Sequence, residues 1–125
     1  GIYKPSVKYR IKAALKDGKV TGYHLKEAAI GSNMYGSIPN FFTAGCIPNY
    51  KVETGNYKSN ITTGAWRAPY TNFLAFAEQS FFDELATELN VDAIQLRLDL
   101  LQNVKNTDDK RIEYSGQRME DTIKL

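Results

Sequence analysis

The first thirty residues alternate between apolar and polar positions. Every second residue from 7 to 13 is apolar. The positions between them are basic: Lys8, Arg10 and Lys12. A repeat of two residues predicts a half-buried strand with one wet side. The pair Asp17-Gly18 follows, and it favours a tight turn between antiparallel strands. We therefore expect a long antiparallel hairpin over about residues 6–30.

From residue 72 to 89 the spacing becomes helical. Phe73, Ala77, Phe81 and Leu85 recur at every fourth position. Further apolar positions, Leu74, Phe82 and Leu89, widen this stripe, whereas Phe76 lies outside it. So wide a stripe is typical of a mostly buried helix, which we expect near 71–89. Asn90 or Asp92 can cap a second helix near 92–103, and residues 117–125 resemble a third helix that is cut short.

The segment between the hairpin and the first helix is less regular. Glycine, proline and asparagine break any period over residues 31–49, but the apolar residues among them predict an ordered loop that packs on something. Short strands are expected at about 50–53 and 57–63. Together these elements predict an α+β fold over residues 1–125, in which 1–66 is rich in strands and 71–125 is helical.

Composition adds modest limits. The chain has 125 residues, of which 42% are hydrophobic and 24% charged, so one domain with one modest core is expected. A net charge of +2 gives no reason to expect nucleic-acid binding, which needs a clustered basic face. No apolar run is long enough for a membrane helix, and one cysteine excludes an internal disulfide.

Few side chains offer chemistry of their own. His24 is the only histidine and lies within a predicted strand, where a hydrogen-bonded ring is the simpler interpretation. Cys46 could act as a nucleophile only with His24 as its base, and a buried inert thiol fits its apolar loop better. The acids Asp83, Glu84 and Glu88 could do acid–base work, although the polar face of a packed helix explains them as well.

The best candidate for ligand contact is the segment Thr63-Gly64-Ala65-Trp66-Arg67-Ala68-Pro69. A strand is expected to end there, and a buried helix follows at once. The first turn of a helix offers free backbone N–H groups, and an arginine adds a rigid positive fork. A purely structural strand–helix junction, with Trp66 in the core, explains the segment equally well.

The same segment carries a family resemblance. Gly64-Ala65-Trp66-Arg67-Ala68-Pro69, then Ser80-Phe81-Phe82-Asp83-Glu84-Leu85-Ala86, then Leu96-Arg97-Leu98 follow one another in this order. This order resembles the large, molybdopterin-binding subunit of the molybdenum hydroxylases, the xanthine dehydrogenase and aldehyde oxidase family. The G-A-W-R turn is similar to that of the isoquinoline 1-oxidoreductase branch. The resemblance runs from about Pro5 to Leu101 and implies an internal fragment of the cofactor-binding domain.

The resemblance implies an oxidoreductase that hydroxylates an aromatic N-heterocycle or an aldehyde with oxygen from water. It implies a molybdenum–molybdopterin cofactor, commonly the cytosine dinucleotide form, and a small [2Fe-2S] partner subunit. Trp66, Arg67 and Ala68 would contact the cofactor, with the backbone of Arg67 near the molybdenum, and Pro69 would stand at the substrate pocket. Bacterial relatives occur in the periplasm or the cytoplasm.

Departures from the family pattern place the chain on a divergent branch. Gln79 stands where relatives have a glutamate in the helix, and Ala93 where they have a proline. The glycine-rich pterin motif and the general-base glutamate of the family are absent, so no catalytic residue is assigned and the fragment alone is expected to be inactive. The alternative is a free-standing interaction module that meets a partner through an aromatic loop at residues 34–50.

Overall fold

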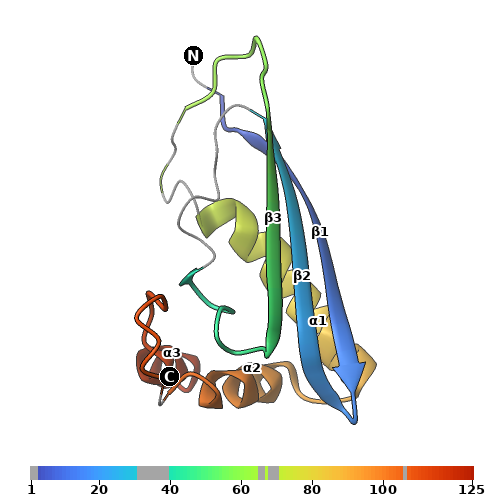
Figure 1. The fold of residues 1–125 in the computed structure, drawn as a ribbon, viewed down its shortest axis with the longest axis vertical. Helices are drawn as coiled ribbons and strands as arrows, with labels where there is room; N and C mark the ends of the chain where they lie inside the picture. Colours follow the sequence, from blue (N-terminus) through green and yellow to red (C-terminus); the bar gives the residue numbers. More distant parts are fainter. Residues whose placement is uncertain (1–2, 31–39, 65–66, 68–70, 106) are drawn as a thin grey trace.

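The computed structural model describes residues 3–30, 40–64, 67, 71–105 and 107–125. It has an α+β fold, as the sequence predicts: a three-stranded sheet is followed by three helices. The strands are β1 (Ser6–Lys16), β2 (Lys19–Ile30) and β3 (Asn49–Tyr57). The helices are α1 (Thr71–Leu89), α2 (Ala93–Gln102) and α3 (Gly116–Ile123). In Figure 1, α1 runs along the sheet, and α2 and α3 gather at the end where β3 begins.

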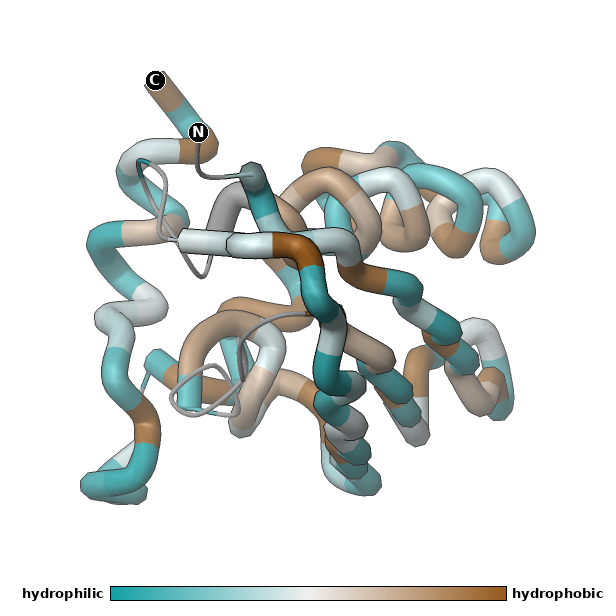
Figure 2. Tube along the Cα trace, turned by 90° about the horizontal axis from the view of Figure 1, so that it is seen from above, coloured by the Kyte–Doolittle hydropathy of each residue, from teal (hydrophilic) through white to brown (hydrophobic). Residues whose placement is uncertain are grey.

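The hairpin is confirmed. β1 and β2 pair antiparallel from Ser6 opposite Ile30 to Lys16 opposite Lys19. Asp17 and Gly18 both have positive φ angles, 51° and 70°, which a tight hairpin turn requires. The alternation of apolar and polar residues along the strands is visible end-on in Figure 2.

The third strand differs from the prediction of two short strands. β3 is one strand of nine residues, and it pairs with β2 in parallel. Beyond it, the only bridge among the described residues joins Tyr3 to Thr63. Residues 58–62 are exposed, and Ile61 is 58% exposed. The predicted strand at 57–63 is therefore wrong, because that segment has no buried face to hold it against a neighbour.

Helix α1 covers one face of the sheet, but its buried stripe is rotated from the one predicted. Leu74, Glu78 and Phe82 are buried, whereas Phe73 and Phe81 are only partly so. Phe76 is exposed, as its place outside the stripe predicts. The rotation arises because the ring of Phe82 stacks on Tyr23 of β2 while Phe81 meets Tyr23 by its edge. A carboxyl group thus enters the centre of the helix–sheet interface.

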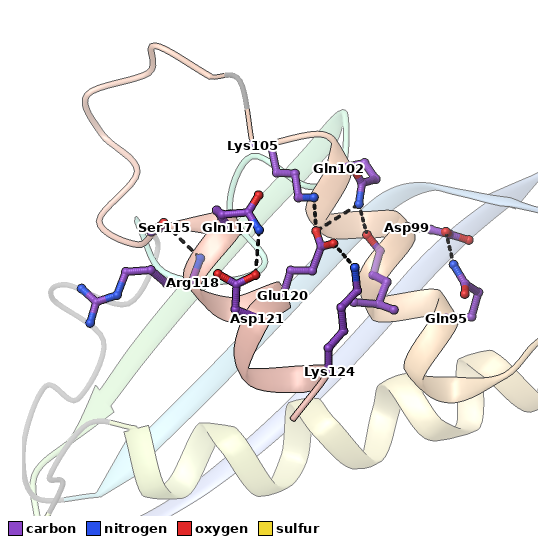
Figure 3. A network of polar contacts seen from close by, with 11 residues as sticks. Gln95, Asp99, Gln102, Lys105, Ser115, Gln117, Arg118, Glu120, Asp121 and Lys124 are labelled. Atoms are coloured by element: carbon purple, nitrogen blue, oxygen red, sulfur yellow. Dashed lines mark hydrogen bonds and ion pairs between the residues drawn. The ribbon is translucent and has the colours of Figure 1, made fainter.

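Helices α2 and α3 are joined through a buried acid. Of the two predicted caps, Asn90 and Asp92, it is Asp92 that caps α2, by accepting from the backbone N–H of Gln95 at 2.8 Å. Glu120 of α3 is 5% exposed and forms ion pairs with Lys105 and Lys124 (Figure 3). Hydrogen bonds from Lys105 and then Lys124 hold the pKa of Glu120 at about 2. Helix α3 ends at Ile123, earlier than the expected 125, and the N–H of Lys124 closes its last turn.

Candidate functional site

The turn before α1 is described only in part. Trp66, Ala68 and Pro69, which the resemblance assigns to the cofactor and substrate, lie outside the described residues. Arg67 is described and is exposed. On its N-terminal side the N–H of Gly64 donates to the carbonyl of Tyr3 at 3.1 Å, and on its C-terminal side α1 begins at Thr71. Arg67 is therefore an exposed residue between Gly64, whose backbone is hydrogen-bonded, and the first residue of α1.

Residues at and beside two motifs of the resemblance meet between α1 and α2. Arg97 of α2 donates from Nε to the side chain of Gln79 at 2.8 Å, and from a terminal nitrogen to the carbonyl of Gln79 at 3.0 Å. The same terminal nitrogen pairs with Asp83 at 2.9 Å. The guanidinium also lies 5.9 Å from the ring centre of Phe82. Arg97 thus fixes α2 against the middle of α1 with the planar geometry that guanidinium favours.

A second polar group lies inside the core. Glu78 of α1 is 4% exposed, and its Oε1 accepts a hydrogen bond from the hydroxyl of Tyr23 at 2.7 Å. Because the donor is a neutral phenol, it offsets only part of the loss of hydration, and burial raises the pKa of Glu78 to about 7. The ring of Tyr23 stacks on Tyr50 of β3, with centroids 5.3 Å apart. Glu78 also lines a hollow of about 220 Å³ beside Phe42 and Tyr114.

Glu27 is the other buried acid on the inner face of the sheet. It is 4% exposed and lies opposite Tyr9 in the β1–β2 register. Burial raises the pKa of Glu27 to about 7. The sequence analysis did not predict that Glu27 and Glu78 are buried. For Glu27 a signal was present, because it shares the strand parity of Leu25 and Ala29, which are buried.

The structure separates the groups that could have formed a nucleophilic pair. Cys46 is 1% exposed within the core, whereas His24 lies on the opposite face of the sheet and bonds Glu53 at 2.5 Å. Tyr114 donates to the carbonyl of Ala44 at 2.5 Å, so the 3.2 Å contact between Tyr114 and Cys46 has the thiol as donor. Burial raises the pKa of Cys46 to about 11. The expected burial of the Cys46 thiol is confirmed, and its lack of reactivity stays a prediction.

Three further features concern the acids of α1, possible metal ligands and membrane-spanning helices. Asp83, Glu84 and Glu88 are all exposed on α1, which agrees with a polar helix face. Among the described residues, no three histidines, cysteines or acids come together as a metal-ligand set. Within the same residues, no helix has both the length and the hydropathy that crossing a membrane requires.

Comparisons with protein-family models, with curated proteins and with solved structures return no match for this chain. The motifs of the chain and the contacts that they make are therefore the basis for a proposal of its function.

Proposed function

We propose that this chain is part of the molybdopterin-binding subunit of a molybdenum hydroxylase similar to isoquinoline 1-oxidoreductase. The intact protein would hydroxylate an aromatic N-heterocycle or an aldehyde with oxygen from water. It would carry a molybdenum–molybdopterin cofactor and work with a small [2Fe-2S] subunit. The bound molybdenum group would supply the two-electron oxidation.

The observation that carries the proposal is the contact between the two helical motifs. The resemblance rests on short motifs that are separate in the sequence, and short motifs also occur by chance. Here Arg97, from the second helical motif, makes its hydrogen bonds to Gln79 and Asp83, at and beside the first. Helices α1 and α2 follow one another in the chain, and this contact brings residues at both motifs to the interface where the two helices pack. Their contact supports the interpretation of both motifs as one unit that fixes α2 against α1.

Within that unit, the residues of this chain would act by position. The backbone N–H of Arg67 lies in the sequence between Gly64, whose own N–H is hydrogen-bonded, and the start of α1, and in the intact protein it would donate to a ligand atom from this position. The side chain of Arg67 would mainly stabilise the turn. Pro69 would border the substrate rather than stack on it, because proline has no aromatic face.

The alternative, an interaction module with an exposed aromatic loop, finds less support. In the described part of that loop, residues 40–50, Thr43, Ala44, Cys46 and Ile47 are buried. Phe42 packs against the rings of Phe82 and Tyr114, with centroids 5.9 and 6.1 Å away. Side chains that complete the core of their own chain are a poor surface for a partner.

Two substitutions in the intact protein test the proposed role of the turn. Arg67→Lys should leave molybdenum content and turnover largely unchanged, because the backbone donor survives. Ala68→Pro should lower both, because proline moves the preceding residue away from a helical conformation and re-aims the turn. If Ala68→Pro is silent while Arg67→Lys abolishes turnover, the arginine acts through its side chain and the backbone account is wrong.

A further inference from the structure

Charge is divided unevenly along this chain. Residues 1–64 hold nine Lys and Arg against three Asp and Glu, whereas residues 65–125 hold seven against eleven. The small net charge of +2 therefore conceals a basic sheet and an acidic helical half. Of the three acids in the first half, Glu27 is buried on the inner face and Asp17 lies in the hairpin turn, so only Glu53 can offset charge on the outer face.

The register of the sheet gathers the basic side chains on the face opposite α1. Lys12, His24 and Lys51 form one row across the three strands, and Arg10, Lys26 and Glu53 form the next. Lys8 continues the series along β1 and is exposed, as are Arg10 and Lys12. We call Lys8, Arg10, Lys12, Lys26 and Lys51 the basic face. Like charges this close raise the free energy of the sheet unless an anion is near.

The outer face of the sheet already holds one carboxylate, that of Glu53. Its carboxylate accepts from His24 at 2.5 Å, from Lys26 at 3.0 Å and from Lys51 at 3.1 Å. Hydrogen bonds from Lys26 first, and then from His24 and Lys51, hold the pKa of Glu53 at about 2. The cations of β2 and β3 thus already share one carboxylate. Those of β1 lie one strand farther out, beside the free edge of the sheet.

That edge is open to another strand. In the described sheet β1 pairs with β2 alone, and Figure 1 shows it at the outer side of the sheet. A strand edge presents unpaired N–H and C=O groups to an added segment. On the inner side of β1, Val7, Tyr9 and Ile11 are only partly buried, so apolar surface is left beside the same edge. The edge therefore offers backbone groups, cations on one face and apolar surface on the other.

We propose that the edge of β1 takes up an extended acidic segment of a protein partner, in which acids alternate with apolar residues. Side chains two residues apart in a strand point to the same face and repeat at about 7 Å. The acids of such a segment would thus lie beside Lys8, Arg10 and Lys12, and its apolar residues beside Val7, Tyr9 and Ile11. This mode of binding is β-strand addition.

The chemistry of the edge favours this occupant over the others. A second copy of β1 would place lysine and arginine beside lysine and arginine, which opposes pairing. A single-stranded nucleic acid would need aromatic rings on which its bases stack. The rows of the basic face contain only the ring of His24, which is bonded to Glu53, and the exposed ring of Tyr57 on the same face is on β3, two strands away from the edge of β1. A strand in which acids alternate with apolar residues would pair with the cations, cover the apolar surface and hydrogen-bond to the backbone of β1.

Fluorescence anisotropy on the full-length protein tests the proposal with a labelled peptide of alternating glutamate and valine. Saturable binding that weakens as salt is added is expected. A peptide of the same composition with its glutamates and valines in blocks should bind at least about tenfold more weakly, since only alternation sorts them to two faces. A peptide with alternate backbone N-methyl groups keeps its carboxylates but cannot form the backbone hydrogen bonds of an added strand. Its affinity should also fall at least about tenfold.

Variants of the protein locate the site. Arg10→Glu with Lys12→Glu should weaken binding of the alternating peptide at least about tenfold. The matched control, Lys58→Glu with Lys110→Glu, makes the same change of charge at exposed positions off the basic face and should change binding less than about twofold. Circular dichroism verifies that each variant is folded, and Arg10→Gln with Lys12→Gln replaces the first pair if it is not.

Each other outcome overturns the proposal. An equal loss of peptide affinity in the two pairs of variants would mean that net charge alone attracts the peptide. Equal binding of the N-methylated peptide would exclude strand addition. Tighter binding of an oligothymidylate would assign the basic face to nucleic acid. Sedimentation that shows self-association, abolished by Arg10→Glu with Lys12→Glu, would assign the edge to a second copy.

Discussion

The buried carboxyl of Glu78 makes the stability of this chain depend on pH. Its pKa is raised in the folded state from an ordinary value near 4.5 to about 7 by burial. Below pH 4.5 the folded and unfolded states both hold the proton, and the stabilisation is complete. Between pH 4.5 and 7 the unfolded state ionises while the folded state stays neutral, so the free energy of unfolding falls. Above pH 7 the loss is complete.

The size of this loss follows from the shift. One pKa unit corresponds to about 1.4 kcal/mol, so the rise of the pKa from 4.5 to about 7 gives an upper limit of roughly 3–4 kcal/mol of unfolding free energy. Glu78→Gln removes the ionisation and keeps an oxygen that can accept from Tyr23. We expect the variant to gain about 3 kcal/mol relative to the wild-type chain between pH 4.5 and pH 8. Glu27 contributes equally to both proteins, so the difference isolates Glu78.

Urea unfolding at half-unit steps from pH 4.5 to pH 8, followed by circular dichroism, measures this difference. Glu84→Gln is the matched control, because Glu84 is an exposed acid on the same helix. Its midpoints should follow those of the wild-type chain across the range. The reasoning is refuted if Glu78→Gln and the wild-type chain keep a constant difference from pH 4.5 to pH 8.

Three further predictions concern stability, reactivity and cofactor content. Arg97→Met should lower the unfolding free energy by about 2–3 kcal/mol, because charged hydrogen bonds to Gln79 and Asp83 are lost, whereas Asp83→Asn should cost below about 1 kcal/mol at its exposed position. Urea midpoints compare the two variants, and a larger loss of stability in Asp83→Asn than in Arg97→Met would contradict the role of Arg97 in fixing α2 against α1. Cys46 should resist a thiol reagent at pH 8 in the folded chain and react promptly in urea; fast labelling of the folded chain would show an accessible thiol. The 125-residue chain alone should bind no molybdenum cofactor, and stoichiometric metal after purification would refute this.

Local signals predicted much of the fold. The hairpin needed only the alternation over residues 7–13 and the Asp17-Gly18 turn, which set register and strand length together. Helix α1 was predicted with its observed bounds, 71–89, because its apolar stripe is long and its spacing regular. The cap of α2 was narrowed to Asn90 or Asp92, because capping is a short-range arrangement, and the structure shows that Asp92 is the cap.

Contacts between distant segments escaped prediction. The parallel pairing of β3 with β2 depends on how residues 31–48 return along the sheet, which no local pattern records. Glu78 was hidden because a carboxylate in an apolar helix is expected on the solvent side, and its burial depends on a hydrogen bond from Tyr23 of the distant strand β2. The basic face was hidden for the same reason: Lys8, Arg10 and Lys12 resembled an ordinary solvated edge until β2 and β3 added their cations beside them.

The most direct measurement is the molybdenum content of the intact protein. The protein would be purified with its partner subunit from cells supplied with molybdate, and its metals and released nucleotide determined by mass spectrometry. The account predicts stoichiometric molybdenum, together with a cytosine nucleotide released from the pterin cofactor. A folded, intact protein that contains neither molybdenum nor a pterin would contradict the proposed function.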